Sequence, residues 1–370
     1  MNPGQLIDRL VKKHWTQADI DKYVGDYQFA ALTHASDEKI RESSASGGTT
    51  SALLINGLAQ GLFDAAVVCK TVIEDGKVRA RFVLASNKEE VLAARGSKYV
   101  ETSFLREVLP LLEAFSGRVA VVGLPCDITA LNRRAFKDPI LADKLQLTIA
   151  LVCGHNSRKE LIDHTTAKLE KQENSELVDY KFRIGHWRGK IEATFANGQI
   201  KQYPTALFND YQNLFFCCEK KCMACYDHYG YHADISIGDV WLYRLKSDPV
   251  KRSGVIVRTD QGKLVYDESL KSGVLVAEQL AIEDIMDGQS RIAPAHYNVS
   301  ARVAVAPQFG YKLIDSVNEQ IKWHQKLNAY LTLKNIKTSE TEAGREKIFK
   351  RPRKLLKFYL YIKKGLETLR

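Results

Sequence analysis

The sequence predicts an α/β protein with a largely parallel sheet and flanking helices, followed by a mixed or antiparallel β region and a C-terminal helical tail. Three patterns indicate this fold. Apolar strand-like runs alternate with helical runs up to about residue 160, an Asn-Gly turn at 197–198 separates two alternating runs, and apolar residues recur at helical spacing in a basic C-terminal segment. With 370 residues, 45% of them hydrophobic, the chain suits one large domain or two ordinary ones.

The first half of the chain carries the α/β pattern. Residues 1–43 are polar, contain no cysteine, and are expected to form a helical extension. Residues 44–160 are expected to form the α/β part, because short apolar runs bounded by turns predict buried strands with helices between them. The expected strands are 65–70, 76–85, 118–124 and 145–153.

The order of elements changes after residue 160. Residues 161–335 are expected to hold an antiparallel hairpin at Asn197-Gly198, then a cysteine loop, and then ADISIGDVWL (233–242) as a strand interrupted by a Gly-Asp turn. Further strands are expected in SGVIVRT and GVLVAEQL, and a helix over 311–335. Residues 336–370 are expected to be a polar linker, TSETEAGRE, leading into a basic amphipathic tail.

The net charge of +10 is concentrated at the C-terminus. Residues 345–370 carry ten Lys/Arg and two Glu, a net +8, so the rest of the chain nets only +2. This near-neutral body does not indicate nucleic-acid binding. In the tail, apolar residues at helical spacing could lie on an anionic membrane surface, or the helix could dock on its own domain or on a partner. They are Leu355, Leu356, Tyr359, Ile362, Leu366 and Leu369.

No apolar run approaches the ~20 residues needed to span a bilayer, and the N-terminus lacks the apolar core of a secretory signal. We therefore expect a cytoplasmic protein, peripheral to the inner face of the membrane if the tail binds lipid. Thiols stay reduced in the cytoplasm, so the seven cysteines are expected to be ligands, nucleophiles or core residues.

Four cysteines form the strongest candidate site. Cys126 and Cys153 follow predicted strands, at the sheet edge where ligands bind in open α/β sheets. Cys126 also precedes a helix, where the dipole favours a thiolate. Cys222 and Cys225 form a C-x-x-C loop, and four thiolates suit either zinc or an iron–sulfur cluster. One pair plus two single cysteines favours the cluster, because structural zinc usually uses two C-x-x-C pairs.

The other cysteines leave alternatives open. Cys217 or Cys218 could replace one of the four, although both follow an apolar LFF run and could simply be buried. Cys69 ends a buried strand and is interpreted as a core residue. A lone catalytic thiol at Cys126 is a further alternative, without an identifiable base beside it.

Two glycine-containing segments could bind a phosphate. In SASGGTTSALL (44–54), small residues precede a helix start, where backbone N–H groups and the helix dipole favour an anion. An ordinary capped helix explains the same pattern. In GSKYV (96–100), Lys98 could pair with a phosphate and Tyr99 could stack on a ring, or both could be ordinary surface residues.

Taken in order along the chain, six segments resemble the beta subunits of coenzyme F-420 hydrogenases and dehydrogenases, in particular the bacterial type associated with polysaccharide biosynthesis. They are SASGGTTSALL, GSKY, GLPCDITAL, LVCGHN, CMAC and ADISIGD. The resemblance is strong over about residues 44–245 and weaker to 335.

The resemblance implies FAD and one 4Fe–4S cluster. It implies that Cys126, Cys153, Cys222 and Cys225 hold the cluster. Two segments look like the ones that hold the flavin: Ser46, Gly47, Gly48 and Thr49, and then Gly96, Ser97, Lys98 and Tyr99. Asp234, Gly238 and Asp239 resemble the family's turn beside the site. Catalytic residues are not identified, and His155 and Lys98 are the candidates.

The chain lacks the ferredoxin-like cysteines with which many relatives begin, since no cysteine precedes Cys69. We therefore expect electrons to come from a separate protein or from a reduced coenzyme. The implied function is an oxidoreductase that passes electrons between a cluster, FAD and an organic substrate, such as the deazaflavin F-420 or a glycan precursor. The alternatives are a non-catalytic, metal-stapled scaffold and a pure electron-transfer subunit of a polysaccharide-assembly complex.

Overall fold

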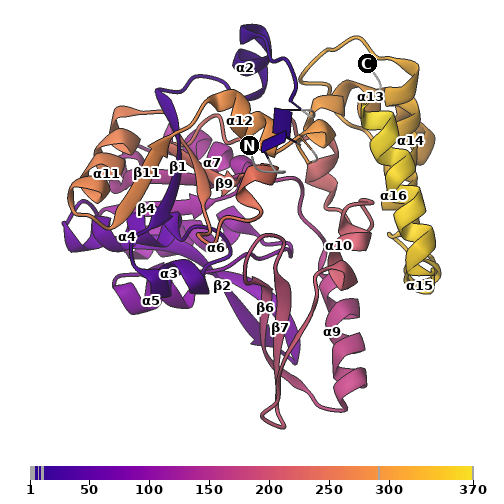
Figure 1. Ribbon diagram of the computed structural model, residues 1–370, viewed down its shortest axis with the longest axis horizontal. Coiled ribbons are helices and arrows are strands. Elements are labelled where there is room, and N and C mark those ends of the chain that lie inside the picture. Colours follow the sequence, from indigo (N-terminus) through magenta and orange to yellow (C-terminus); the bar gives the residue numbers. More distant parts are fainter. Residues whose placement is uncertain (1–4, 7, 10–11, 291, 369–370) are drawn as a thin grey trace.

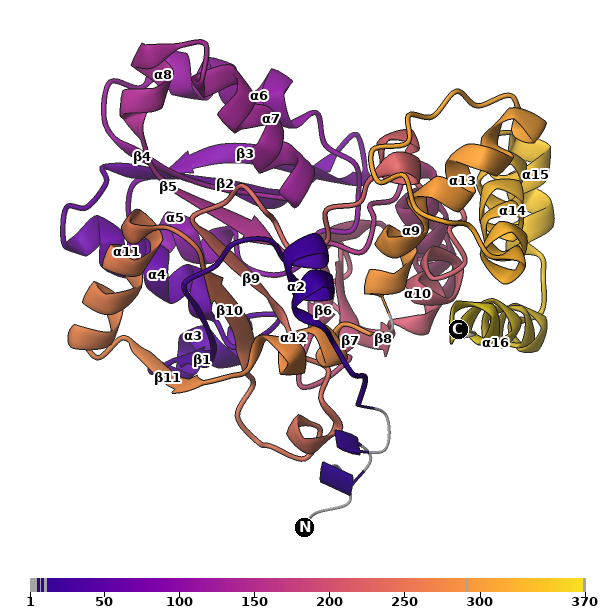
Figure 2. The same ribbon diagram turned by 90° about the horizontal axis from the view of Figure 1, so that it is seen from above.

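An eight-stranded sheet forms the centre of the protein (Figures 1 and 2). The computed structural model describes residues 5–6, 8–9, 12–290 and 292–368. The strand order is β11-β1-β10-β9-β5-β4-β2-β3, and the four central strands β9, β5, β4 and β2 run parallel. The strands are β1 (Phe29–Ala35), β2 (Ala65–Glu74), β3 (Lys77–Ala85), β4 (Val119–Gly123), β5 (Leu145–Leu151), β9 (Ile235–Asp239), β10 (Ser253–Val257) and β11 (Leu275–Gln279).

Helices cover both faces of this sheet, as Figure 2 shows. Leu53 and Leu54 of one helix and Val265 of another pack on one face, and Val108 and Ile128 pack on the other. The central strand β4 is buried along its whole length, as its continuous apolar run predicts. The helices are α3 (Glu38–Ser43), α4 (Thr49–Ala59), α5 (Lys88–Ala93), α6 (Phe104–Ala114), α7 (Pro125–Ala135), α8 (Pro139–Lys144), α11 (Asp260–Lys271) and α12 (Ile282–Gly288). The predicted α/β class is confirmed.

The expectation that residues 1–43 are helical is wrong for 29–35. Helix α2 (Gln17–Tyr23) precedes that segment, but FAALTHA forms β1, which lies between β10 and β11. Its burial depends on pairing with strands that come more than two hundred residues later, such as Phe29 with Val257. The local sequence does not reveal these partner strands, so the polar residues around 29–35 predict a helix there instead of a strand.

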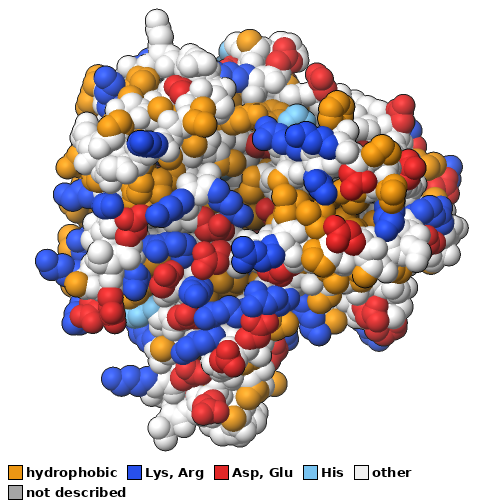
Figure 3. All heavy atoms as spheres, turned by 180° about the vertical axis from the view of Figure 1, so that it is seen from behind, with side chains coloured by type: hydrophobic (Ala, Val, Ile, Leu, Met, Phe, Trp, Pro, Cys, Tyr) orange, Lys and Arg blue, Asp and Glu red, His pale blue; other side chains and the backbone are white. Residues whose placement is uncertain are grey.

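A second, antiparallel sheet projects below the first in Figure 1. It consists of β6 (Leu177–Ile184), β7 (Lys190–Phe195) and β8 (Ile200–Pro204), and the predicted hairpin at Asn197-Gly198 joins the last two. Helices α9 (Lys159–Glu173) and α10 (Ala206–Gln212) pack on it through one apolar cluster. Figure 3 shows acidic and basic side chains intermingled over the lower part of the back face. Within the small sheet, Lys181 of β6 pairs with Glu192 of β7 at 2.8 Å.

The C-terminal part is helical, as predicted, but its boundaries differ. The helix expected over 311–335 starts only at residue 323, and the segment expected to be a polar linker contains α15, whose N-cap Thr341 accepts a bond from the Gly344 N–H at 3.1 Å. These helices are α13 (Val299–Val305), α14 (Trp323–Thr338), α15 (Glu342–Phe349) and α16 (Arg353–Thr368). In the described part of the chain, no helix is long and apolar enough to cross a membrane.

Lys363 of α16 is buried in the contact between α14 and α16. Its side chain is 1% exposed, and the ammonium donates hydrogen bonds to the Asn328 amide oxygen at 2.8 Å and to the Thr332 hydroxyl. Burial lowers the pKa of Lys363 to about 7, with Lys364 and Arg302 adding repulsion that Glu367 only partly offsets. The ammonium is therefore easily deprotonated in the folded chain.

This burial predicts that raising the pH stabilises the protein. From about pH 7 to pH 9 the unfolded chain keeps a proton on Lys363 that the folded chain loses, so the free energy of unfolding gains about 2 kcal/mol from this residue. Urea unfolding of the parent and of Lys363→Met at both pH values measures this gain as the difference between the two chains. An identical pH response in both would show that Lys363 is not the group responsible.

Candidate metal centre and cofactor pocket

Four free cysteines meet at the carboxyl edge of the main sheet. Cys126 lies in the first turn of α7, directly after β4, and Cys153 lies two residues after the neighbouring parallel strand β5. Cys222 belongs to a 3₁₀ turn (Lys220–Ala224), and Cys225 follows it. Parallel neighbours end at the same edge, so this topology brings together three segments that are far apart in the sequence.

Backbone hydrogen bonds fasten the C-x-x-C loop to the segment after β5. The Asn156 N–H donates to the Cys222 sulfur at 3.4 Å, and the Glu219 N–H donates to the Asn156 carbonyl at 3.1 Å. A β-bridge between Ser157 and Cys218 continues this contact. The loop is therefore fixed beside Cys153.

The thiols interact electrostatically with one another. Burial raises the pKa of Cys153 well above its usual value, and charges on Cys222, Cys126 and Cys225 raise it further. Burial and Cys222 raise the pKa of Cys225 to about 12. The Cys218 thiol donates to the Glu219 carbonyl at 3.4 Å, and its interaction with Cys222 lowers the pKa of Cys222.

Two cations lie beside the thiols. Arg302 of α13 is 4% exposed, and its Nε donates to the Met223 carbonyl, inside the C-x-x-C loop, at 2.5 Å. Thiolate charges on Cys218, Cys225 and Cys222 favour its protonated form, against the cost of burial. Lys221 lies 3.5 Å from Glu219 and 3.8 Å from Asp127. Positive charge next to several thiolates reduces their mutual repulsion.

Two buried histidines hold the backbone of the cysteine segments. His296 lies within hydrogen-bond distance of the Cys225 carbonyl, at 3.1 Å, and of the Gly154 carbonyl, at 2.6 Å. His228 contacts the Cys153 carbonyl at 2.8 Å, and burial lowers its pKa to about 4. Both imidazoles are neutral at physiological pH and connect the loop to the end of β5. Sequence reasoning missed His296 and Arg302, because single residues in a helical region give no motif.

The remaining cysteines separate into two groups. Cys69 lies in β2 and Cys217 in the core of the small sheet, and no other thiol is among the main charges that act on either of them. Cys218 is buried against Cys222, so it is the one alternative to the expected set that the structure also brings to the site. The expectation that the helix start favours a thiolate at Cys126 is wrong for this residue, because burial and the neighbouring Asp127 raise its pKa.

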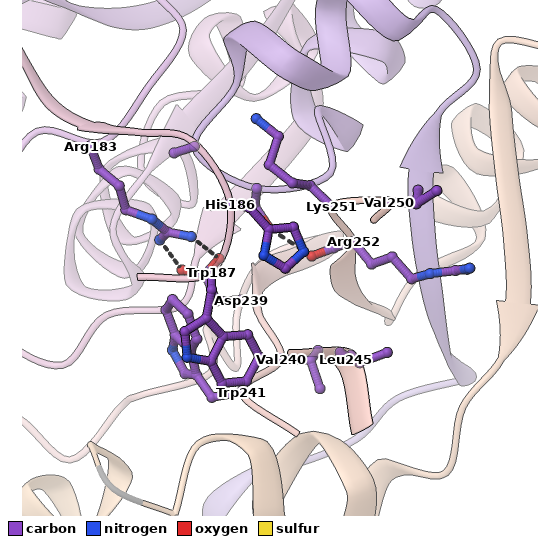
Figure 4. A pocket seen from close by; sticks show the side chains of 12 residues that line it. Arg183, His186, Trp187, Asp239, Val240, Trp241, Leu245, Val250, Lys251 and Arg252 are labelled. Atoms are coloured by element: carbon purple, nitrogen blue, oxygen red, sulfur yellow. Dashed lines mark hydrogen bonds and ion pairs between the residues drawn. The ribbon is translucent and has the colours of Figure 1, made fainter. Parts of the chain in front are cut away.

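A cationic pocket lined by tryptophans lies at the end of β9 (Figure 4). Arg183 of β6 forms a two-pronged ion pair with Asp239, at 2.5 and 2.9 Å, and lies 4.8 Å above the Trp241 ring. Trp187 meets Trp241 edge-to-face with ring centroids 5.3 Å apart. The lining residues are Ala45, Ser46, Arg183, His186, Trp187, Asp239, Val240, Trp241, Leu245, Val250, Lys251 and Arg252.

The segment Ser46–Thr49 borders this pocket and is tied to the sheet. The Ser46 hydroxyl donates to the Arg252 carbonyl at 2.7 Å, and the Gly47 N–H donates to the Ser253 hydroxyl at 3.0 Å. The Thr49 hydroxyl bonds the Thr33 hydroxyl at 2.8 Å. Gly48 is the N-cap of α4. Because glycine has no side chain, no N-cap side chain accepts a hydrogen bond from the first N–H groups of this helix.

Gly48 is expected to tolerate alanine poorly. Its φ is +77°, and a Cβ there would lie 3.2 Å from Ala35 and Ile40, so Gly48→Ala should lower the free energy of unfolding by about 2 kcal/mol. Gly61→Ala is the matched control, because its φ of +64° carries the same strain with no atom within 4 Å. Urea unfolding of both variants measures the difference. A larger loss in the control would contradict the proposed packing of Gly48 against β1 and α3.

The segment Gly96–Tyr99 does not line this pocket. The Lys98 ammonium donates to the carbonyls at the end of α5, including Gly96 at 3.0 Å, and burial lowers its pKa to about 8. Tyr99 packs edge-to-face on Phe182 in the core of the small sheet. Tyr99 also interacts electrostatically with Arg183, which connects the two regions indirectly.

Asp234, Gly238 and Asp239 do not form the expected turn. Asp234 precedes β9, where its carboxylate accepts bonds from Thr148 and Thr259, whereas Asp239 ends the same strand at the pocket. The alternation of Ile235 and Ile237 keeps the backbone extended between the two carboxylates. Gly238 packs against Val152, which precedes Cys153.

The catalytic candidate His155 lies under the segment after α10. Its Nε2 is 3.0 Å from the Gln212 carbonyl, and its ring stacks on Phe215 with centroids 4.1 Å apart. Burial lowers its pKa to about 4, so the imidazole is neutral at physiological pH.

Four free thiols at a sheet edge suit a metal or iron–sulfur centre, and the relatives make the protein an oxidoreductase. Family comparison narrows this class. The chain belongs to the coenzyme F420 hydrogenase/dehydrogenase beta subunit family, with residues 30–110 matching its N-terminal model and residues 116–283 its C-terminal model.

Individual relatives agree with this assignment. The coenzyme F420 hydrogenase subunit beta of Methanosarcina barkeri is 26% identical over 281 residues, covering 72% of this chain and 87% of that protein. Its counterpart in Methanococcus voltae is 28% identical, covering 71% and 88%. A chain of the F420-reducing [NiFe] hydrogenase complex from Methanosarcina barkeri has the same fold, with a TM-score of 0.59 at 20% identity, covering 79% of this chain and 97% of that one.

Proposed function

We propose that this chain is an iron–sulfur and flavin-dependent oxidoreductase, with one 4Fe–4S cluster held by Cys126, Cys153, Cys222 and Cys225. The observation that carries the proposal is the meeting of four half-buried, mutually interacting thiols from three separate segments at one sheet edge. Free thiols suit a reducing compartment, which in this proposal is the cytoplasm.

The donor set suits a cluster. Four cysteine sulfurs are the usual ligands of a 4Fe–4S centre, and Lys221 and Arg302 offset their negative charge. In the described ranges, no three His, Cys, Asp or Glu side chains converge as a single metal ion requires. Ligands of a four-iron cluster stand further apart than those of one ion, because the cluster is several atoms wide.

The pocket of Figure 4 supports a flavin site. Three cations line the pocket against the two carboxylates of Asp239 and Asp248, with which Arg183 and Arg252 pair, so the positive charge in excess is that of Lys251, whose ammonium donates to the Glu42 and Ser44 carbonyls. The start of α4 beside Ser46 offers N–H groups without a side-chain cap for phosphate groups. Trp187 and Trp241 offer ring surfaces for stacking. A bound FAD exchanges a hydride with an organic molecule and single electrons with a cluster. In this proposal Arg183 is held in place by Asp239 and orients the anionic part of the cofactor.

The substrate class follows from the relatives. Proteins named coenzyme F420 hydrogenase subunit beta and coenzyme F420-dependent sulfite reductase match most of this chain, which supports a deazaflavin coenzyme or a similar organic hydride carrier as substrate. A glycan precursor is the alternative for a member associated with polysaccharide assembly. Because the relatives include a subunit of a hydrogenase, we infer a separate protein as electron partner.

Reduction kinetics test whether the chain is a complete enzyme. Anaerobically purified protein is mixed with the reduced deazaflavin coenzyme, NADPH or reduced ferredoxin, and bleaching of the flavin absorbance is followed. Turnover is then measured in the presence of an artificial electron acceptor. We expect rapid bleaching and turnover with an organic coenzyme. Bleaching by ferredoxin alone, without turnover of any organic molecule, would instead identify a pure electron-transfer subunit.

A further inference from the structure

The last helix, α16, has two apolar faces. The inner one packs on the protein, where Leu356, Tyr359 and Leu360 meet Leu214 and Ile348. The outer one has large apolar side chains that contact solvent: Leu355 is 52% exposed, Phe358 64%, Tyr361 72% and Ile362 44%. They are spaced three and four residues apart, which places them on one side of the helix. Figures 1 and 2 show α16 at the outer edge of the C-terminal helices.

Basic residues border this outer face. Lys354 and Lys357 are exposed, and within the part of the chain that the structure describes they form no ion pair. Arg353, by contrast, is neutralised by Asp210 at 2.6 Å. The segment from 345 to 370 nets +8 and the rest of the chain only +2, so the excess positive charge is concentrated in the segment that carries the exposed apolar side chains.

We propose that the outer face of α16 (Leu355, Phe358, Tyr361 and Ile362, with Lys354 and Lys357) rests on the surface of an anionic lipid bilayer. Apolar and aromatic side chains on one side of a helix enter the headgroup region, while lysines extend their stems to reach lipid phosphates. The helix lies in the plane of the surface, and its inner face remains packed on the protein.

Charge decides between this surface and another copy of the chain. A symmetric dimer through this face would bring two sets of unpaired lysines together, which is repulsive. An anionic bilayer attracts the same lysines and accepts the apolar side chains at once. The surface contains none of the proposed cofactor residues, so this inference does not depend on the proposed redox function.

Vesicle flotation of the full chain tests the proposal. We expect the protein to float with vesicles in which phosphatidylglycerol replaces part of the phosphatidylcholine, and to remain unbound with phosphatidylcholine alone. Binding should weaken strongly at about 1 M salt, where the screening length falls to about 3 Å. Equal binding to both kinds of vesicle, or to neither, would overturn the proposal, and the second result would leave an acidic protein as the partner of this face.

Two double variants separate the apolar and the ionic parts. Lys354→Gln/Lys357→Gln should bind anionic vesicles about thirtyfold more weakly, and Phe358→Ser/Tyr361→Ser about tenfold or more. The matched control is Phe136→Ser/Lys137→Gln, which removes an exposed aromatic ring (Phe136 is 91% exposed) and a lysine at the end of α7. All replaced side chains are exposed, so thermal unfolding should be unchanged. Equal weakening by the control would refute a specific role for α16.

Discussion

The Cys153→Ser variant is expected to lose nearly all of its iron, from about four atoms per chain to less than one. Cys153 interacts with all three of the other proposed ligands, since burial and the charges on Cys222, Cys126 and Cys225 together raise its pKa. A serine hydroxyl is a poor ligand for iron at neutral pH, and a cluster with three firm ligands is open to solvent and oxygen. Iron and sulfide analysis of anaerobically purified protein, with the visible absorption spectrum, measures the loss.

Matched variants show whether the effect is specific. Cys69→Ser should keep its iron, because the main charges acting on Cys69 are Lys98, Glu107 and Asp127 and none of the other thiols. Cys218→Ser decides the remaining alternative, since its thiol contacts Cys222 and could replace it as a ligand. Iron retained in Cys218→Ser and lost in Cys222→Ser supports the proposed set. The reverse result would exchange the two residues.

The Asp239→Asn variant should lower the free energy of unfolding by about 3 kcal/mol. Arg183 is buried, with its side chain 7% exposed, and burial opposes its charge. Asp239 more than compensates for this cost and holds the pKa of the guanidinium above its usual value. Asparagine keeps the shape but leaves the buried cation without its partner. Urea unfolding followed by tryptophan fluorescence reports on the pocket directly, because Trp187 and Trp241 line it.

Asp163→Asn is the control for this prediction. Asp163 forms a similar two-pronged pair with Arg79, at 2.6 and 3.2 Å, but both side chains are more exposed to solvent than Arg183 is. Exposed pairs contribute about 1 kcal/mol or less, so this variant should be nearly as stable as the parent. Similar losses in the two variants would contradict the buried character of the Arg183–Asp239 pair.

The sequence was sufficient to predict that Cys126 and Cys153 follow two strands of a parallel sheet, β4 and β5. Strand-ending cysteines in a parallel sheet must share an edge, and the C-x-x-C loop needed only to reach it. The central strands were equally predictable, because continuous apolar runs such as VAVVG have few alternatives.

The residues that surround the site could not be predicted, because they depend on long-range packing. Arg183 reaches the pocket from the small antiparallel sheet. Its buried charge is stabilised by Asp239, which comes far later in the chain. Arg302 lies in a short helix without a motif and contacts the cysteine loop only in the folded chain. The same reason explains β1, whose two partner strands lie near the other end of the sequence.

The most direct test of the proposed redox function is an absorption spectrum of anaerobically purified protein, with iron, sulfide, zinc and flavin quantified on the same sample. The proposal predicts about four irons per chain, matching sulfide, and one flavin. Stoichiometric zinc, or a colourless protein with neither cofactor, would contradict it and would favour a metal-stapled or cofactor-free scaffold.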